Sequence, residues 1–126
     1  MISLAPSARV YLASAPMDMR CGHDGLFAIV RRWGLDPFSG HLFAFVGKRH
    51  DKLKALVWQR GGFLLLYKRL EKGRFRIPAV RADGERAVLD STELMMLLDG
   101  IDLTQVRRPK LWTPPETLPG RGARAQ

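Results

Sequence analysis

Two strand-like segments flank a short glycine-rich turn in the middle of the chain. The segments "LKALVWQ" (53–59) and "FLLLYKRL" (63–70) are separated by "RGG" (60–62), and paired glycines readily adopt the positive φ that a tight hairpin needs. A third apolar segment, "HLFAFVG" (41–47), precedes them across the charged loop "KRHDK" (48–52). Three consecutive strands with short links predict an antiparallel β-meander.

Helical spacing occurs on both sides of this meander. A stripe of apolar residues from Leu26 to Trp33 predicts a helix over roughly 22–33, which ends near Gly34. Farther on, Asp90 and Glu93 have the spacing of a capping box, and the stripe that follows them predicts a second helix. We therefore predict an α+β fold, a small antiparallel β-meander of three to five strands with one helix before and one after it.

The additional strands would come from segments outside the meander, namely 9–14, 74–80 and 86–89. The strands at 41–47 and 63–67 are apolar on both faces, which leaves two arrangements open. Both helices could cover one face while a partner subunit covers the other. Alternatively, the helices cover both faces.

The 126 residues suit a single domain. Proline and glycine dominate the sequence after Arg108, so we expect a domain over 1–108 and a flexible tail over 109–126. No long apolar run predicts a membrane span, and the N-terminal segment lacks the basic start of a signal peptide. The single cysteine, Cys21, excludes an internal disulfide framework. We expect a cytoplasmic protein.

The positive charge of the chain is concentrated in its middle third. Lys and Arg number 21 against 12 Asp and Glu, and residues 48–86 alone hold twelve of the basic and four of the acidic residues. Such a field attracts nucleic acids or acidic proteins. A solubilising surface is the plainer interpretation.

Chain reversal is expected to bring these charges together. In an up-and-down meander, the loop at 48–52 and the end of the strand at 63–70 lie at the same end of the sheet. We therefore predict a basic patch that contacts DNA phosphates. The predicted DNA-binding residues are Lys48, Arg49, Lys52, Lys54, Lys68, Arg69, Lys72 and Arg74. Aromatic residues for base stacking are scarce there, and only Phe75 is near enough in sequence to consider.

No catalytic constellation stands out. The twelve acidic residues are scattered, and Cys21 with His23 is too small a set to build a metal site. A phosphate-binding loop is also missing, because "RGGF" (60–63) lacks the Lys-Ser/Thr and the helix that would follow it. We expect a protein without enzymatic activity, metal or other cofactor.

Six motifs occur in an order that resembles the small accessory protein, called Orf2 or TnpB, of the IS Sixty-Six group of bacterial insertion sequences. They are "DMR" (18–20), "DGL" (24–26), "GHLFAF" (40–45), "RHDKLKALVW" (49–58), "GGFLLLYKRLEKGRF" (61–75) and "LMMLLDGID" (94–102). The resemblance covers roughly residues 8–103. It does not extend to the RNA-guided nucleases that share the TnpB label.

This resemblance implies an accessory role in transposition, with catalysis left to a separate transposase. The implied partners are DNA at the transposon ends or target, the transposase and another accessory protein, with no membrane; a homo-oligomer stays open. The positions that match the signature, without roles attached, are Asp18, Met19, Arg20, Lys54, Lys68, Arg69, Glu71, Gly73 and Phe75. The chain departs from the family pattern near Cys21 and His23 and at Ile77, which stands where a tryptophan is expected.

Two functional hypotheses follow. The first is a DNA-binding accessory of transposition that uses the basic patch. The alternative is an adaptor that docks on the transposase without binding DNA itself. A small nuclease is a remote third option, since the carboxylates show no clustering.

Overall fold

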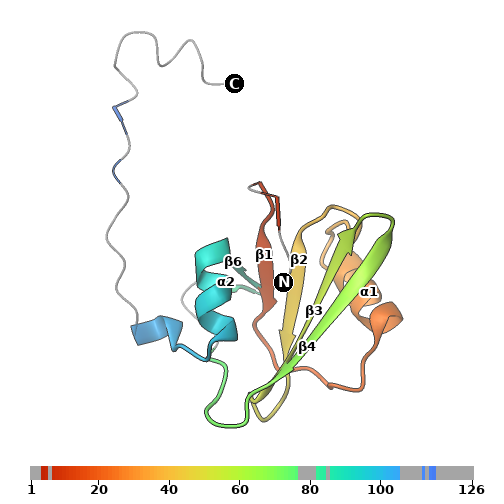
Figure 1. The fold of residues 1–126 in the computed structure, drawn as a ribbon. Coiled ribbons are helices and arrows are strands. Elements are labelled where there is room, and N and C mark those ends of the chain that lie inside the picture. The colour runs from red at the N-terminus through yellow and green to blue at the C-terminus, as the bar shows by residue number, and fades with distance from the viewer. Residues whose placement is uncertain are drawn as a thin grey trace.

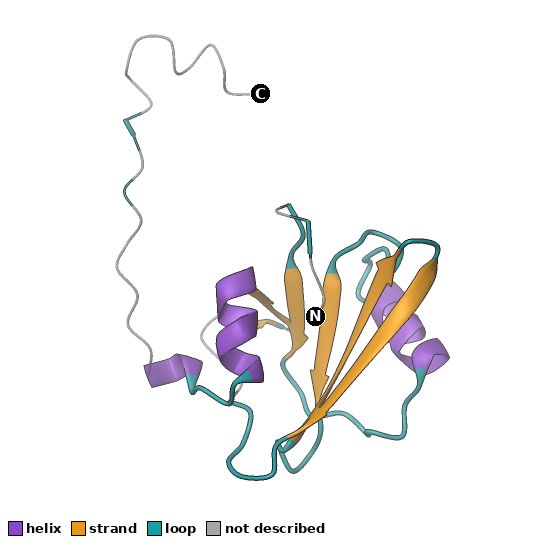
Figure 2. Ribbon diagram, in the orientation of Figure 1, coloured by secondary structure: helices purple, strands orange, loops and turns teal. Residues whose placement is uncertain are grey.

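The structure is a computed structural model, and it describes residues 4–5, 7–76, 82–84, 86–105, 112 and 114–115 (Figure 1). The expected boundary between domain and tail at 108–109 lies outside these residues. The described part consists of a single sheet, two flanking α-helices and a short 3-10 helix, η2 (Leu103–Gln105) (Figure 2).

The sheet has six strands in the order β4-β3-β2-β1-β6-β5. Their bounds are β1 (Val10–Ala13), β2 (Leu42–Val46), β3 (Lys52–Gln59), β4 (Gly62–Arg69), β5 (Ala82–Asp83) and β6 (Arg86–Leu89). One helix, α1 (His23–Arg32), comes before the β2–β3–β4 meander and another, α2 (Ser91–Leu98), comes after it. The predicted fold class, α+β with a β-meander between two helices, is confirmed.

The hairpin between β3 and β4 forms where the glycines predicted it. Gln59 pairs with Gly62, and the two residues between them, Arg60 and Gly61, both have positive φ (50° and 83°). A turn with two left-handed residues matches the right-handed twist of the flanking strands. Its shortness holds β3 and β4 in one register along their full length, as far as the pair of Lys52 with Arg69.

β1 has a parallel neighbour in the sheet, which the predicted antiparallel arrangement did not include. It pairs in parallel with β2, Tyr11 lying beside Phe43, and antiparallel with β6 on its other edge. Parallel neighbours need a crossover, and α1 supplies it. The additional strand expected at 74–80 is absent over 74–76, and residues 77–80 lie outside the described residues.

The two helices cover opposite faces of the sheet, so the second of the two arrangements is correct. Alternate residues along a strand point to opposite faces. On one face, Leu26 of α1 packs in a buried cluster with Phe43 and Phe45 of β2. On the other face, Leu97 of α2 shares a cluster with Ala44 of the same strand. β2 has five buried residues because it is covered from both sides.

The start of α2 is stabilised as its sequence predicted. The carboxylate of Asp90 accepts a hydrogen bond from the main-chain N–H of Glu93 at 2.8 Å. In return, the carboxylate of Glu93 accepts the N–H of Asp90 at 3.1 Å. This capping box satisfies main-chain N–H groups that have no partner within the helix.

Candidate nucleic-acid interface

The two basic segments meet at one end of the sheet. The main-chain N–H of Leu70 donates to the carbonyl of Asp51 at 2.7 Å, and that of Phe75 donates to the carbonyl of His50 at 2.6 Å. These bonds fasten the β2–β3 loop to the segment that follows β4. Chain reversal therefore brings the segments together, as the sequence predicted. We call the eight predicted residues on them the basic rim: Lys48, Arg49, Lys52, Lys54, Lys68, Arg69, Lys72 and Arg74.

Five members of the basic rim form neither an ion pair nor a side-chain hydrogen bond within the described part of the chain. The ion pairs within the described part of the chain are Arg20–Asp18 and Arg69–Glu71. The remaining cations of the rim therefore have no ion-pair partner there. Four of the five cations are exposed and Lys52 is half-buried; the five are Lys48, Arg49, Lys52, Lys72 and Arg74.

The other three members of the basic rim have partners inside the protein. The ammonium of Lys68 donates to the carbonyl of Leu98 at 2.5 Å, at the end of α2. The Arg69 guanidinium donates to the Glu71 carboxylate at 2.7 Å, and this hydrogen bond raises the pKa of Arg69. Lys68 thus connects β4 to the end of α2, which the sequence did not indicate, whereas the Arg69–Glu71 pair is local and exposed.

Lys54 is the most enclosed cation of the rim, with 9% of its surface exposed. Its ammonium donates to the carbonyl of Cys21 at 3.0 Å and lies 5.4 Å from the centre of the Tyr67 ring. The side chain therefore connects β3 to the segment that leads into α1. The register places Lys54 on the α1 face and Lys68 on the α2 face, so the rim wraps around the end of the sheet.

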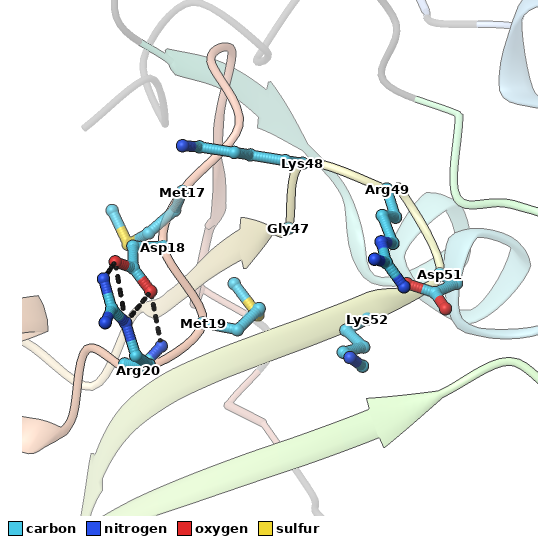
Figure 3. Close-up of a pocket in the computed structure, with 9 residues that line it drawn as sticks. All are labelled: Met17, Asp18, Met19, Arg20, Gly47, Lys48, Arg49, Asp51 and Lys52. Carbon is cyan, nitrogen blue, oxygen red and sulfur yellow. Dashed lines mark hydrogen bonds and ion pairs between the residues drawn. The ribbon is translucent and has the colours of Figure 1, made fainter.

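A hollow of about 290 Å³ lies against this rim (Figure 3). One wall is the segment from Met17 to Arg20, which includes the "DMR" signature, and the other is the β2–β3 loop. Met17 continues the parallel pairing beyond β1 and β2, because its N–H donates to the carbonyl of Val46 at 2.8 Å. The lining residues are Met17, Asp18, Met19, Arg20, Gly47, Lys48, Arg49, Asp51 and Lys52.

Sequence reasoning did not place the signature beside the basic loop. About thirty residues separate Asp18 from Lys48, and only the crossover through α1 brings them together. The parallel pairing of β1 with β2 was the missing information, since parallel strands end at the same side of a sheet. A strand before a helix and a second strand after it were the signals that could have indicated this unit.

Asp18 and Arg20 form a local pair on the wall of the hollow (Figure 3). The guanidinium donates to the carboxylate through Nη2 at 2.6 Å and through Nε at 3.1 Å, and the N–H of Arg20 adds a bond of 2.9 Å. The hydrogen bonds from Arg20 hold the pKa of Asp18 well below its usual range, with a smaller contribution from the charge of Lys48. The pair is local and exposed, and 91% of the Arg20 side chain is accessible to solvent.

The other signature residues have structural roles. Phe75 is completely buried in the cluster beneath α2, so it is not available to stack on a base, and that interpretation is wrong. Gly73 has a φ of +87°, a backbone conformation that other residues rarely adopt. Ile77, where the family pattern departs, lies outside the described residues.

The described part of the chain contains neither a cluster of metal ligands nor a helix that could span a membrane. No three His, Cys, Asp or Glu side chains of that part approach each other as ligands of one metal ion would. None of its helices has the length and apolar character of a membrane span.

Comparison with known proteins identifies the family. Residues 8–108 match the family model of the IS66 (IS Sixty-Six) Orf2-like protein. Two relatives come from Sinorhizobium fredii. The uncharacterized protein y4jC is 36% identical over 115 residues, which cover 90% of this chain and 97% of the relative. The uncharacterized protein y4hO is 38% identical over 104 residues, or 81% and 88% of the two chains.

No solved structure matches the chain. The family match spans most of the sequence and includes β1, the crossover, the meander and α2. The chain therefore belongs to the IS66 Orf2-like family, a membership that supports an accessory role in the transposition of an insertion sequence.

Proposed function

We propose that this protein is a non-catalytic accessory of transposition that contacts DNA phosphates through its basic rim. The observation that carries the proposal is the fastening of two basic segments to one another by the Leu70–Asp51 and Phe75–His50 hydrogen bonds. Cations held on a common rim repel each other. A polyanion would relieve this repulsion and release its own counterions.

Within the rim, the cations without an internal partner are the natural phosphate contacts. Lys48, Arg49 and Lys52 border the hollow, and Arg20 lies on its opposite wall (Figure 3). A phosphate group in this hollow would lie between the two walls, where four cations outnumber the carboxylates of Asp18 and Asp51. Lys54 and Lys68 contribute to the positive field, but their ammonium groups already donate to main-chain carbonyls.

The decisive experiment compares two triple charge reversals in a duplex DNA binding assay. One variant reverses Lys48, Arg49 and Lys72 to Glu on the rim. The matched control reverses Arg31, Arg32 and Arg60 to Glu, because these exposed cations belong to α1 and to the hairpin turn and not to the basic rim. Both variants change the net charge equally.

We expect the rim variant to lose DNA binding at about 50 mM salt, where the control keeps it. For the wild type, log K should fall with log[salt] at about −0.9 per phosphate neutralised. Equal losses in the two variants would mean that net charge alone drives binding and would contradict the rim. Terminal inverted-repeat DNA and random DNA, with and without the transposase, would then report specificity.

The alternative function, an adaptor that docks on the transposase, makes a different prediction. The positive rim would face an acidic surface of that protein. A complex of the two proteins would survive nuclease treatment, and the isolated accessory would not shift free DNA. The same pair of charge-reversal variants tests this interpretation when the transposase replaces DNA as the ligand.

A further inference from the structure

β4 forms an open edge of the sheet. It is the first strand in the order, and within the described residues its pairing partner is β3 alone. The strand is eight residues long and contains no proline. Its side chains include exposed apolar groups, with Leu64 39% and Tyr67 55% exposed. A long apolar edge of this kind offers main-chain groups for pairing with another strand.

The register shows which main-chain groups point outward. In a hairpin with a two-residue turn, the residues that flank the turn form a hydrogen-bonded pair, here Gln59 and Gly62. Hydrogen-bonded pairs then alternate with non-bonded pairs along the strands. The even-numbered residues from Gly62 onward thus bond to β3. Leu70, which directly follows β4, fits this pattern because its N–H donates to the carbonyl of Asp51. The outward-facing residues are therefore Phe63, Leu65, Tyr67 and Arg69.

We propose that the edge of β4 pairs with β4 of a second copy, antiparallel and about a two-fold axis at Leu66. The outward-facing residues all have odd numbers, and they can exchange hydrogen bonds only with one another. About a two-fold axis, the numbers of two opposed residues add up to twice the position of the axis, so an axis between two residues would pair odd with even numbers. The axis must therefore pass through a residue. An axis at Leu66 uses all four outward-facing residues. Each Tyr67 then lies opposite Leu65 of the second copy.

The charges of β4 favour this antiparallel arrangement of two copies. From Gly62 to Tyr67 the strand has no charge, and Lys68 and Arg69 are together at one end. With the axis at Leu66, they lie opposite Leu64 and Phe63 of the second copy. Parallel pairing in register would instead place each of these cations beside its own equivalent, and like charges in opposed positions are destabilising.

Such pairing would extend one sheet across two copies, with Tyr67 beside Leu65 of the second copy on the α1 face and Leu64 beside Lys68 of the second copy on the α2 face. Because the strands are antiparallel, the two basic rims lie toward opposite ends of the seam. Arg69 and its equivalent are six residues apart along the strand direction, or roughly 20 Å at about 3.3 Å per residue. The dimer thus presents two separated cationic rims.

A matched pair of substitutions tests the pairing. Tyr67→Pro removes an outward N–H and places a ring on the open edge, where proline is tolerated within a sheet. Tyr67→Ala removes the same side chain and keeps the N–H. Sedimentation velocity over a series of protein concentrations, without DNA, should show a dimer for the wild type and for Tyr67→Ala. Tyr67→Pro should sediment as a monomer.

A wild type that remains monomeric up to several hundred micromolar would overturn the proposal, as would a dimeric Tyr67→Pro variant. Equal dissociation of both variants would show that the side chain, and not the strand edge, holds the dimer. If the proline variant does not fold, amide hydrogen exchange of the wild type tests the pairing instead. The outward amides of Leu65 and Tyr67 should gain protection as concentration rises, and a lack of gain overturns the pairing.

Discussion

Gly47 and Met19 lie so close together that a Cβ atom on Gly47 would stand 2.8 Å from Cγ of Met19. The residue directly after β2 therefore lacks a side chain where the signature segment crosses it. The contact is part of the wall of the hollow, since both residues line it. Close packing at this point fixes how the "DMR" segment and the basic loop lie relative to each other.

Gly47→Ala should destabilise the protein by about 1–3 kcal/mol, because Met19 has to move to admit the new methyl group. Gly62→Ala is the matched control, since nothing lies within 4 Å of a Cβ there. Urea denaturation of both variants measures the difference. Adding Met19→Ala to Gly47→Ala should recover part of the loss, and strictly additive losses would argue against the contact.

The Asp18 carboxyl should titrate below the usual aspartate range, about 3.9, because Arg20 stabilises its ionised form. A lowered folded-state pKa contributes stability that is present above the unfolded pKa. That contribution is lost as the pH falls through the folded pKa. NMR titration of the carboxyl carbon measures this directly. Arg20→Gln should return the pKa toward its ordinary value, whereas Arg31→Gln should leave it unchanged.

Phe75→Ala should cost about 3–5 kcal/mol of stability, since the ring is fully buried under α2. Phe75→Leu keeps most of the apolar volume and should cost less than about 1.5 kcal/mol. The leucine variant should also bind DNA as tightly as the wild type at a temperature where both are folded. A large loss of affinity in a folded Phe75→Leu protein would restore base stacking as a role for this residue.

Lys54→Met and Lys52→Met should distinguish rim cations that hydrogen-bond within the protein from rim cations that have no such partner there. Lys54 donates to the Cys21 carbonyl and is nearly buried, so its loss should lower the thermal midpoint more than the loss of Lys52. Lys52, half-buried on the border of the hollow, should instead contribute more to DNA affinity. Thermal denaturation and the DNA binding assay together check both expectations, and the reverse ranking would contradict them.

Asp90→Ala should destabilise the protein by about 1 kcal/mol, because the first turn of α2 loses its side-chain acceptor. Ser91→Ala, at the next position and exposed, is the control and should change stability little. Urea denaturation midpoints compare the two. Equal midpoints for both variants would mean that the cap adds nothing to the stability of the domain.

Local signals in the sequence were sufficient for much of the fold. The glycines at 60–62 marked the hairpin, and the Asp90–Glu93 spacing marked the start of α2. Counting chain reversals in the meander also placed Lys52 near Arg69. These predictions succeeded because each depends on residues that are neighbours in the chain or on strands joined by short turns.

Such local signals did not predict the hollow or the burial of Lys54. The parallel pairing of β1 with β2 brings Asp18 to Lys48 across the whole of α1, and only the strand–helix–strand order of the sequence pointed to such a pairing. The sequence by itself determined the three meander strands, the two α-helices and the concentration of positive charge. Only the tertiary structure decided which cations face solvent and which donate to a carbonyl, because those partners come from segments far apart in the chain.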